Sequence, residues 1–232
     1  MGTHEGTLDG NVVPWAMQIV VHVVRNPTPQ HTAVLRATAS AVVLALAAFT
    51  RDDADPDVRS RTDHWRRGPI RKVVRRARGA GWTRQLAVSG VFVHHADDVD
   101  VAVHVPGPVD EVDPEIARLQ VGGLVLHDVE PVDVPDADVS LLLNPHLELT
   151  TGKAAAQVAH AAQLVLQSVP AVHAAVWVAT GAQVRVMVAG EGEWDHLLAT
   201  APVVVTDGGF TEVAPGTITV VATHPWERLS AG

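Results

Sequence analysis

The sequence contains no cysteine and no tyrosine, and only two of its 232 residues are lysines, Lys72 and Lys153. Without cysteine the chain can form no disulfide, has no thiolate nucleophile and offers no Cys-ligated zinc site. This composition fits a reducing compartment, and we expect a cytoplasmic protein. The adjacent pair His94 and His95 lies on a predicted strand, where neighbouring side chains point to opposite faces. We therefore expect no metal site, and no other cofactor.

A long apolar run is also missing. The longest, residues 37–49, is shorter than the roughly 20 residues that cross a bilayer. The first ten residues have no basic region followed by an apolar stretch, so they do not resemble an export signal. We expect no membrane association, and we expect the 37–49 run to lie in a buried helix.

Valine and alanine make up most of the apolar residues. Valine-rich runs favour buried strands and alanine-rich runs favour helices, which together indicate an α/β protein. Helices are predicted at 31–49, 66–78, 111–120, 152–166 and 193–201, with a loop at 51–60. Strands are predicted at 17–27, 90–95, 99–105, 122–128, 137–145, 174–179, 183–190, 202–209 and 216–225.

This order of elements occurs twice along the chain. Residues 14–136 form one predicted unit and residues 137–227 the second. Aligning Val91 with Val176, and Leu124 with Val203, superimposes valines and places Asp128 on Asp207. The predicted fold is therefore two tandem small three-layer α/β/α units with mixed β-sheets, packed as a pseudo-dimer.

Charge is distributed unevenly along the chain, whose net charge is −9. Eleven of the seventeen lysines and arginines lie at residues 51–84, and twelve of the twenty-six acidic residues lie at 97–138. We interpret residues 51–84 as a basic insertion of the first unit. Such a segment can attract a polyanion to one face of an acidic protein. It can equally be a solvated basic helix that pairs with the acidic segment after it.

The stretch TTGKAAAQVAHAAQ contains a cation at the start of a predicted helix. Thr150 or Thr151 can cap this helix, because a hydroxyl accepts from a free N–H of the first turn. Lys153 then lies at the positive end of the helix dipole, where a cation is unfavourable unless an anion binds beside it. Lys153, Gln157 and His160 share one face at i, i+4 and i+7. The alternative is a surface lysine and a core histidine on an ordinary packed helix.

A second polar motif, TDGGFTEVAPGTIT, follows a buried strand. Asp207 lies where that strand ends, a position from which loops present functional groups. The Asp-Gly-Gly sequence permits a tight turn with positive φ. Taken alone, the motif is also consistent with a plain Asp-Gly turn before the last strand.

Together the two motifs resemble the type II peptidyl-tRNA hydrolase family. GKAAAQVAHA at 152–161 matches the family's Gly-Lys and the helix that follows it, and DGGFTEVAPGTITVVA at 207–222 matches its C-terminal motif. The resemblance covers roughly residues 137–225. It implies hydrolysis of the ester between peptide and tRNA, without a metal. It also implies tRNA as partner, and a further homodimer, since members of the family often pair.

The resemblance carries particular roles to residues of this chain. Lys153 would stabilise the oxyanion, and water would be activated near Asp207, with His160 as a second base or a positioning group. Predicted catalytic residues are Lys153, Asp207, Thr211 and His160; predicted substrate-binding residues are Gly152, Gln157, Gly209 and Thr217. Possible tRNA contacts in the basic insertion are Arg66, Arg67, Arg71, Lys72, Arg75, Arg76 and Arg78.

The sequence departs from the family at NPHL, residues 144–147, where the family has Arg-x-Asp-Leu. The first unit departs further, because it has no Gly-Lys before its helix and Ser40 falls near the place of His160. We therefore expect the first copy to be inactive and kept for packing and tRNA binding. Two alternatives stay open: a tRNA- or protein-binding module that has lost catalysis, and a small-molecule hydrolase on the same fold.

Overall fold

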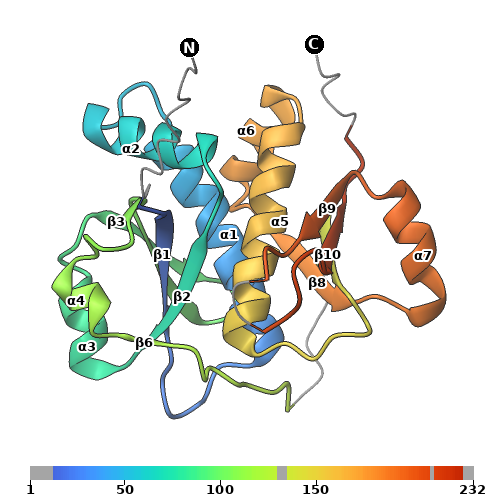
Figure 1. Ribbon diagram of the computed structural model, residues 1–232, viewed down its shortest axis with the longest axis horizontal. Helices are drawn as coiled ribbons and strands as arrows, with labels where there is room; N and C mark the ends of the chain where they lie inside the picture. The colour runs from blue at the N-terminus through green and yellow to red at the C-terminus, as the bar shows by residue number, and fades with distance from the viewer. Residues whose placement is uncertain (1–12, 130–134, 210–211, 227–232) are drawn as a thin grey trace, which may run out of the picture.

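Two mixed β-sheets stand on either side of a central pair of helices in the computed structural model (Figure 1). It describes residues 13–129, 135–209 and 212–226. The first sheet belongs to the N-terminal half and the second to the C-terminal half. The central helices are α1, His31–Phe49, and α5, Thr151–Ser168. Each half contributes one of them, so the two halves meet along this helix pair.

The N-terminal sheet has the strand order β3-β4-β1-β2-β6, with β5 paired to β1. β1 runs parallel to β2 and antiparallel to β4, which pairs with β3. The strands are β1 Trp15–His22, β2 Lys72–Ala77, β3 Gly90–His95, β4 Val99–His104, β5 Gly107–Pro108 and β6 Gln120–Val121. The remaining helices of this half are α2 Pro56–Arg67, α3 Gly79–Gln85 and α4 Pro114–Ala117.

The C-terminal sheet has the order β8-β7-β10-β9. β7 runs parallel to β8 and antiparallel to β10, which pairs with β9. The strands are β7 Val139–Leu143, β8 Val184–Val188, β9 Val203–Thr206 and β10 Ile218–Thr223, and the other helices are α6 Ala171–Ala179 and α7 Glu191–Thr200. Strand for strand, this is the arrangement of β2-β1-β4-β3, so the two halves share one topology.

The shared topology corrects the alignment proposed from the sequence. The β3–β4 hairpin corresponds to β9 and β10, not to residues 176–188. Val176 lies in helix α6, so the strand predicted at 174–179 is wrong. Leu124 lies in an irregular segment, so the strand predicted at 122–128 is wrong as well. There Gly122 and Gly123 have φ of 74° and 61°, which breaks an extended strand.

The helix predicted at 66–78 is also wrong. Helix α2 ends at Arg67, and Lys72–Ala77 forms strand β2 beside β1. Parallel pairing to a buried strand outweighs the local preference of this arginine-rich segment, whose long stems also cover apolar surface. The loop predicted at 51–60 ends early, because Asp55 caps α2 and Pro56 begins it. Much of the supposed insertion is thus α2 and β2, which match α6 and β8 of the other half.

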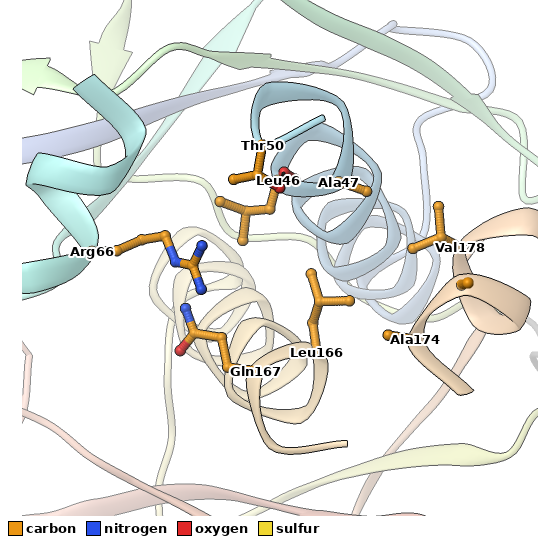
Figure 2. A pocket seen from close by; sticks show the side chains of 9 residues that line it. Leu46, Ala47, Thr50, Arg66, Leu166, Gln167, Ala174 and Val178 are labelled. Atoms are coloured by element: carbon orange, nitrogen blue, oxygen red, sulfur yellow. Dashed lines mark hydrogen bonds between the residues drawn. The ribbon is translucent and has the colours of Figure 1, made fainter. Parts of the chain in front are cut away.

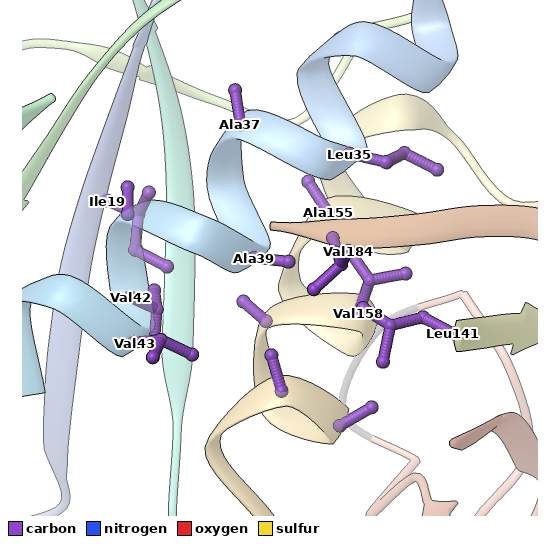
Figure 3. Close-up of a cluster of buried hydrophobic side chains, with 14 of the residues drawn as sticks. Ile19, Leu35, Ala37, Ala39, Val42, Val43, Leu141, Ala155, Val158 and Val184 are labelled. Atoms are coloured by element: carbon purple, nitrogen blue, oxygen red, sulfur yellow. The ribbon is translucent and has the colours of Figure 1, made fainter. Parts of the chain in front are cut away.

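One continuous apolar core joins the two halves. Alanines let α1 and α5 approach closely, and Figure 3 shows Ala39 of α1 near Ala155 and Val158 of α5. The outer face of each sheet has a smaller cluster of its own. Trp82 of α3 packs on the N-terminal sheet and Trp194 of α7 on the C-terminal sheet. Each half therefore has the predicted α/β/α layers, with α1 or α5 as its inner layer.

Helix α1 alone among the described helices is long and apolar enough to cross a membrane. However, 78% of its apolar window is buried inside the protein. Its residues pack against α5, β3, β4 and β8. Packing on all sides accounts for its apolar composition, and the burial predicted for residues 37–49 is confirmed.

Because the core is shared, damage to one half is expected to destabilise both. We predict that Val158→Ala, at a fully buried position of α5, lowers the free energy of unfolding by about 2 kcal/mol. Urea unfolding followed by tryptophan fluorescence is expected to stay a single transition. The control Val172→Ala, at an exposed position of α6, should change little. Two separate transitions in the wild type would contradict the shared core.

Candidate active site

The start of helix α5 is capped and tethered to the C-terminal loop. The Thr150 hydroxyl accepts from the backbone N–H of Lys153 at 3.2 Å. The Glu212 carboxylate accepts from the Thr150 N–H at 2.9 Å and from its hydroxyl at 2.6 Å. Thr150 is therefore the cap, one of the two predicted, and Glu212 is a residue that sequence reasoning did not single out. These bonds set the position of Lys153 relative to the loop that contains Asp207.

Lys153 and Asp207 form a largely buried ion pair, with side chains 10% and 7% exposed. Lys153 Nζ donates to Asp207 Oδ2. Gln157 Nε2 donates to the same oxygen at 2.8 Å, and the hydroxyl of Thr219 donates to Gln157 Oε1 at 2.6 Å. Thr219 is fully buried on β10, so it orients the Gln157 amide. The predicted polar face of α5 thus contacts Asp207 at the end of β9. Thr219, which orients this contact, was not among the predicted site residues.

The turn after Asp207 requires glycine at residue 209. Gly209 has φ +77°, and a Cβ there would meet the ring of Pro215 at 2.3 Å. Its N–H donates to Asp207 Oδ1 at 2.7 Å. The Asp207 N–H donates to the Thr217 carbonyl at 2.8 Å. The Asp-Gly-Gly turn therefore holds the carboxylate toward Lys153.

Asp207 is a carboxylate over the ordinary pH range. Burial by itself would raise its pKa, but bonds from Lys153, Gly209 and Gln157 hold the pKa below its usual value. A carboxylate with a lowered pKa is a weak general base at neutral pH. The arrangement is better suited to orienting Lys153, Gln157 and a water than to abstracting a proton outright.

His160 is neutral at physiological pH. Burial, helped by the nearby charge of Lys72 and opposed by that of Asp207, lowers the pKa of His160 to about 3. A neutral imidazole offers one donor and one acceptor nitrogen. His160 can therefore bind substrate or position a neighbour, but the imidazolium form is scarcely populated above pH 5.

Lys153, Gln157, His160 and Asp207 line one cleft of about 470 Å³. One wall is the polar face of α5 with the Asp207 turn. The opposite wall is residues 69–74 and 121–122 of the N-terminal half. The cleft therefore lies between the two halves, which the sequence did not predict.

Most of the predicted site residues are brought together here. Gly152, Lys153, Gln157, His160 and Asp207 line the cleft. A Cβ added at Gly152 would lie 3.7 Å from the Cβ of Leu124, an ordinary contact. The packing of Leu124 therefore does not require glycine at residue 152. Gly209 and Thr217 build the adjoining turn, and the Thr217 hydroxyl donates to the Ala214 carbonyl at 2.7 Å. Thr211 lies outside the described residues.

The predicted tRNA contacts are dispersed. Arg71 and Lys72 line the cleft. Arg75 donates to Gln18 and to the carbonyls of residues 117 and 119, and Arg76 to Gln120 and the Gly123 carbonyl. Arg67 and Arg78 are exposed. Arg66 reaches a separate groove of about 290 Å³ between α1, α5 and α6, where it lies near Gln167 (Figure 2).

In the N-terminal half a different ion pair joins the inner helix to a strand end. Arg36 of α1 binds Asp97, just after β3, with two bonds of 2.7 and 2.8 Å. Taking the helix caps Gln30 and Thr150 as equivalent, Ala33 stands where Lys153 does. Asp128, predicted as the counterpart of Asp207, instead accepts from the N–H and hydroxyl of Thr32 at the start of α1. The lysine–aspartate arrangement is absent from this half.

The departure from the family at residues 144–147 lies beside the cleft rather than in it. The Asn144 side chain donates to the Ile218 carbonyl at 2.8 Å and accepts from the His146 N–H at 2.9 Å. Asn144 and Leu147 line a neighbouring cavity of about 310 Å³ with His31. Asn144 therefore organises the loop after β7, and the Lys153–Asp207 pair is built without the family's arginine and aspartate.

Among the described residues, no group of three or more histidine, cysteine, aspartate or glutamate side chains is arranged to hold a metal ion. His94 and His95 point to opposite faces of β3, one exposed and one buried, as predicted. His94 contacts Asp100 and His95 contacts Asp97. The polar groups at the N-terminal end of α5 in the cleft are the Lys153 ammonium, the Asp207 carboxylate, the Gln157 amide and the neutral His160 imidazole.

The comparison with known families agrees with the geometry. Residues 138–230 match the family described as peptidyl-tRNA hydrolase PTH2. No curated protein and no solved structure matches the chain significantly. The matched part runs from the start of β7 and includes α5 and the Asp207 turn. The resemblance predicted from the two motifs is confirmed for the C-terminal half.

We expect Gly209→Ala to disrupt the Asp207 turn, because alanine is strained at this φ and its Cβ overlaps Pro215. The variant should lose about 2 kcal/mol or more of unfolding free energy, measured by urea denaturation. The control is Gly192→Ala in helix α7, where an added Cβ meets nothing within 4 Å. That variant should be unchanged or more stable by up to about 1 kcal/mol. Equal behaviour of the two variants would contradict the described turn.

The lowered pKa of His160 makes folding sensitive to acid. The unfolded state binds a proton near pH 6.5 and the folded state only near pH 3, so stability falls as pH drops below 6.5. At pH 5 the loss from this residue is about 2 kcal/mol.

His31 and His104, whose pKa values burial also lowers, act in the same direction. Comparing wild type with His160→Gln between pH 5 and 7.5 isolates the contribution of His160. Between pH 7.5 and 5, His160→Gln should lose less unfolding free energy than wild type. The control His146→Gln, at an exposed site, should lose as much as wild type. Parallel pH profiles for His160→Gln and wild type would show that His160 is not buried as described.

Proposed function

We propose that the C-terminal half hydrolyses the ester bond between the peptide and the tRNA of peptidyl-tRNA. The single observation that carries the proposal is the buried Lys153–Asp207 pair at the N-terminus of α5, inside a cleft. The family match over residues 138–230 supports the substrate. A lysine whose position is determined by a carboxylate and a helix cap is suited to stabilising charge that develops during acyl transfer.

Lys153 would act as the oxyanion donor. The backbone N–H groups of Gly152 and Lys153 are already used, by the Leu124 carbonyl and the Thr150 hydroxyl. The Lys153 ammonium has three N–H groups and donates one hydrogen bond to Asp207. The other two N–H groups can therefore donate to the substrate carbonyl. The side chain rather than the helix amides therefore provides the positive charge at the ester.

Asp207 would accept a hydrogen bond from the attacking water and keep Lys153 in place. The water oxygen attacks the carbonyl carbon, and the resulting oxyanion is stabilised by Lys153. Collapse breaks the carbon–oxygen bond to the ribose, whose oxygen takes up the proton that the water has lost. Gln157, oriented by Thr219, would bind the substrate beside this centre. Thr211 stays a predicted relay outside the described residues.

The N-terminal half would be a second copy of the unit without the chemistry. Its strand order and directions repeat those of the C-terminal half. Its helix and strand end are joined by a closed arginine–aspartate pair, in which both Asp97 oxygens are bound by Arg36. A bidentate pair of this kind uses both carboxylate oxygens on one guanidinium, which suits a structural link between a helix and a strand end. The packing of α1 on β8 and of α5 on β2 supports a pseudo-dimeric arrangement of the copies.

We expect Lys153→Ala and Asp207→Asn each to lower turnover about 10²- to 10³-fold. The assay is release of tRNA from a purified N-blocked aminoacyl-tRNA. The control is Asp195→Asn, which removes an exposed carboxylate on α7 and should keep wild-type turnover. Because breaking a buried pair also costs stability, melting temperatures are measured beside the rates, and the assay is run well below the lowest.

Wild-type turnover that survives both substitutions would place the active site elsewhere. If the wild type binds tRNA but does not hydrolyse the ester, the protein is instead a tRNA-binding module. That is the first of the two alternatives that the sequence left open.

A further inference from the structure

The N-terminal half contributes a lysine to the cleft. Strand β2 begins at Lys72, and the residues around it form the wall that faces α5. Lys72 Nζ donates to Gln163 Oε1 of α5 and lies 5.2 Å from the centre of the Trp65 ring. Within the described part of the chain, Lys72 forms no ion pair. It is therefore a cation held in place by neutral groups.

Such a lysine is unfavourable for folding unless it has another use. Burial lowers the pKa of Lys72 to about 7, which means that the protein interior disfavours its charge. A methionine or leucine would fill the same space without that cost. Buried groups with strongly perturbed pKa values in a cleft are characteristic of functional sites. An anionic ligand would give the Lys72 ammonium the opposite charge that no described residue of the protein provides.

The position of Lys72 defines where that anion would lie. Gln163, its partner, is ten residues beyond Lys153 on α5, which is about 15 Å along a helix axis. His160 lies between them and lines the same cleft. The lining of the cleft therefore extends from the Lys153–Asp207 pair past His160 to Lys72, whose hydrogen-bond partner Gln163 is itself fully buried. An extended single-stranded nucleic acid end covers such a distance within a few nucleotides.

We propose that Lys72 binds a backbone phosphate in the single-stranded 3′ end of the tRNA, so that the inactive half completes the substrate site of the active half. This inference rests on the proposed function. The ester would lie at Lys153, and the strand would run along α5 toward β2. Lys72 is thus a substrate-binding residue, distinct from the group that stabilises the reacting carbonyl.

The ionisable groups around Lys72 are compatible with this role. His160 faces it from α5 and is neutral, so it neither repels the lysine nor binds the phosphate as a cation. Arg71 is its neighbour in the chain, while Lys153, Asp207 and Glu212 lie toward the other end of the cleft. Binding of a phosphate should therefore weaken as the pH rises through the pKa of Lys72.

The first test is binding of a short fluorescent single-stranded RNA with the 3′-terminal sequence of tRNA, followed by anisotropy. Lys72→Met should weaken binding about tenfold and reduce the log–log salt slope by about 0.7, the effect of losing one phosphate contact on a single strand. Lys72→Arg should retain binding and remove its weakening between pH 6 and 8.5. The control Arg51→Gln removes an exposed charge outside the cleft and should match wild type.

The second test separates phosphate binding from catalysis. N-acetyl-aminoacyl-adenosine contains the ester but no phosphate. For the N-blocked aminoacyl-tRNA, Lys72→Met should raise KM about tenfold with kcat retained, and its effect on kcat/KM for the phosphate-free ester should be much smaller. If Lys72→Met fails to fold, the double variant Lys72→Met with Gln163→Leu takes its place. It removes both partners of the hydrogen bond, so that neither is left buried and unpaired.

Unchanged RNA affinity in Lys72→Met would overturn the proposal and leave Lys72 a structural residue. An equal loss on both esters would overturn it too, because Lys72 would then act at the reacting centre. If wild type hydrolyses neither ester, the proposed function fails. The RNA-binding comparison does not depend on turnover and would still decide whether Lys72 binds the strand.

Discussion

The packing of α1 against α5 is the interaction on which the rest of the structure depends. Each helix is the inner layer of its own half, and alanines on both sides allow the backbones to approach closely. Close-packed interiors leave few gaps, so a helix in this position is fixed on every side. The polar face of α5 can therefore be held in place by a core that its own half could not supply alone.

The same packing explains why the cleft belongs to both halves. With α5 between the sheets, one of its faces must turn toward β2 of the other half. Where that face is apolar it joins the core, and where it is polar it lines the cleft. Packing two units of the same topology on their inner helices thus gives the cleft a second wall. An isolated C-terminal half would lack that wall.

The two halves differ in the ion pair that joins the inner helix to a strand end. In the C-terminal half, Asp207 is joined to Lys153, an ammonium that retains protons for a ligand. In the N-terminal half, both oxygens of Asp97 accept hydrogen bonds from Arg36, one from Nε and one from Nη2. Both pairs connect an inner helix to a strand end, so both stabilise the same junction. The lysine pair lines the cleft, whereas neither Arg36 nor Asp97 does.

The sequence by itself determined the local features: the helix at 31–49, the face shared by Lys153, Gln157 and His160, and the turn at Asp207. These follow from spacing and turn chemistry within a few residues. The sequence left the cap of α5 open between Thr150 and Thr151. It could not determine strand β2, the helical state of residues 171–179 or the alignment of the halves, because pairing between distant segments overrides local preference. Tertiary structure alone decided that Thr219 orients Gln157 and that Lys72, from the other half, faces the same cleft.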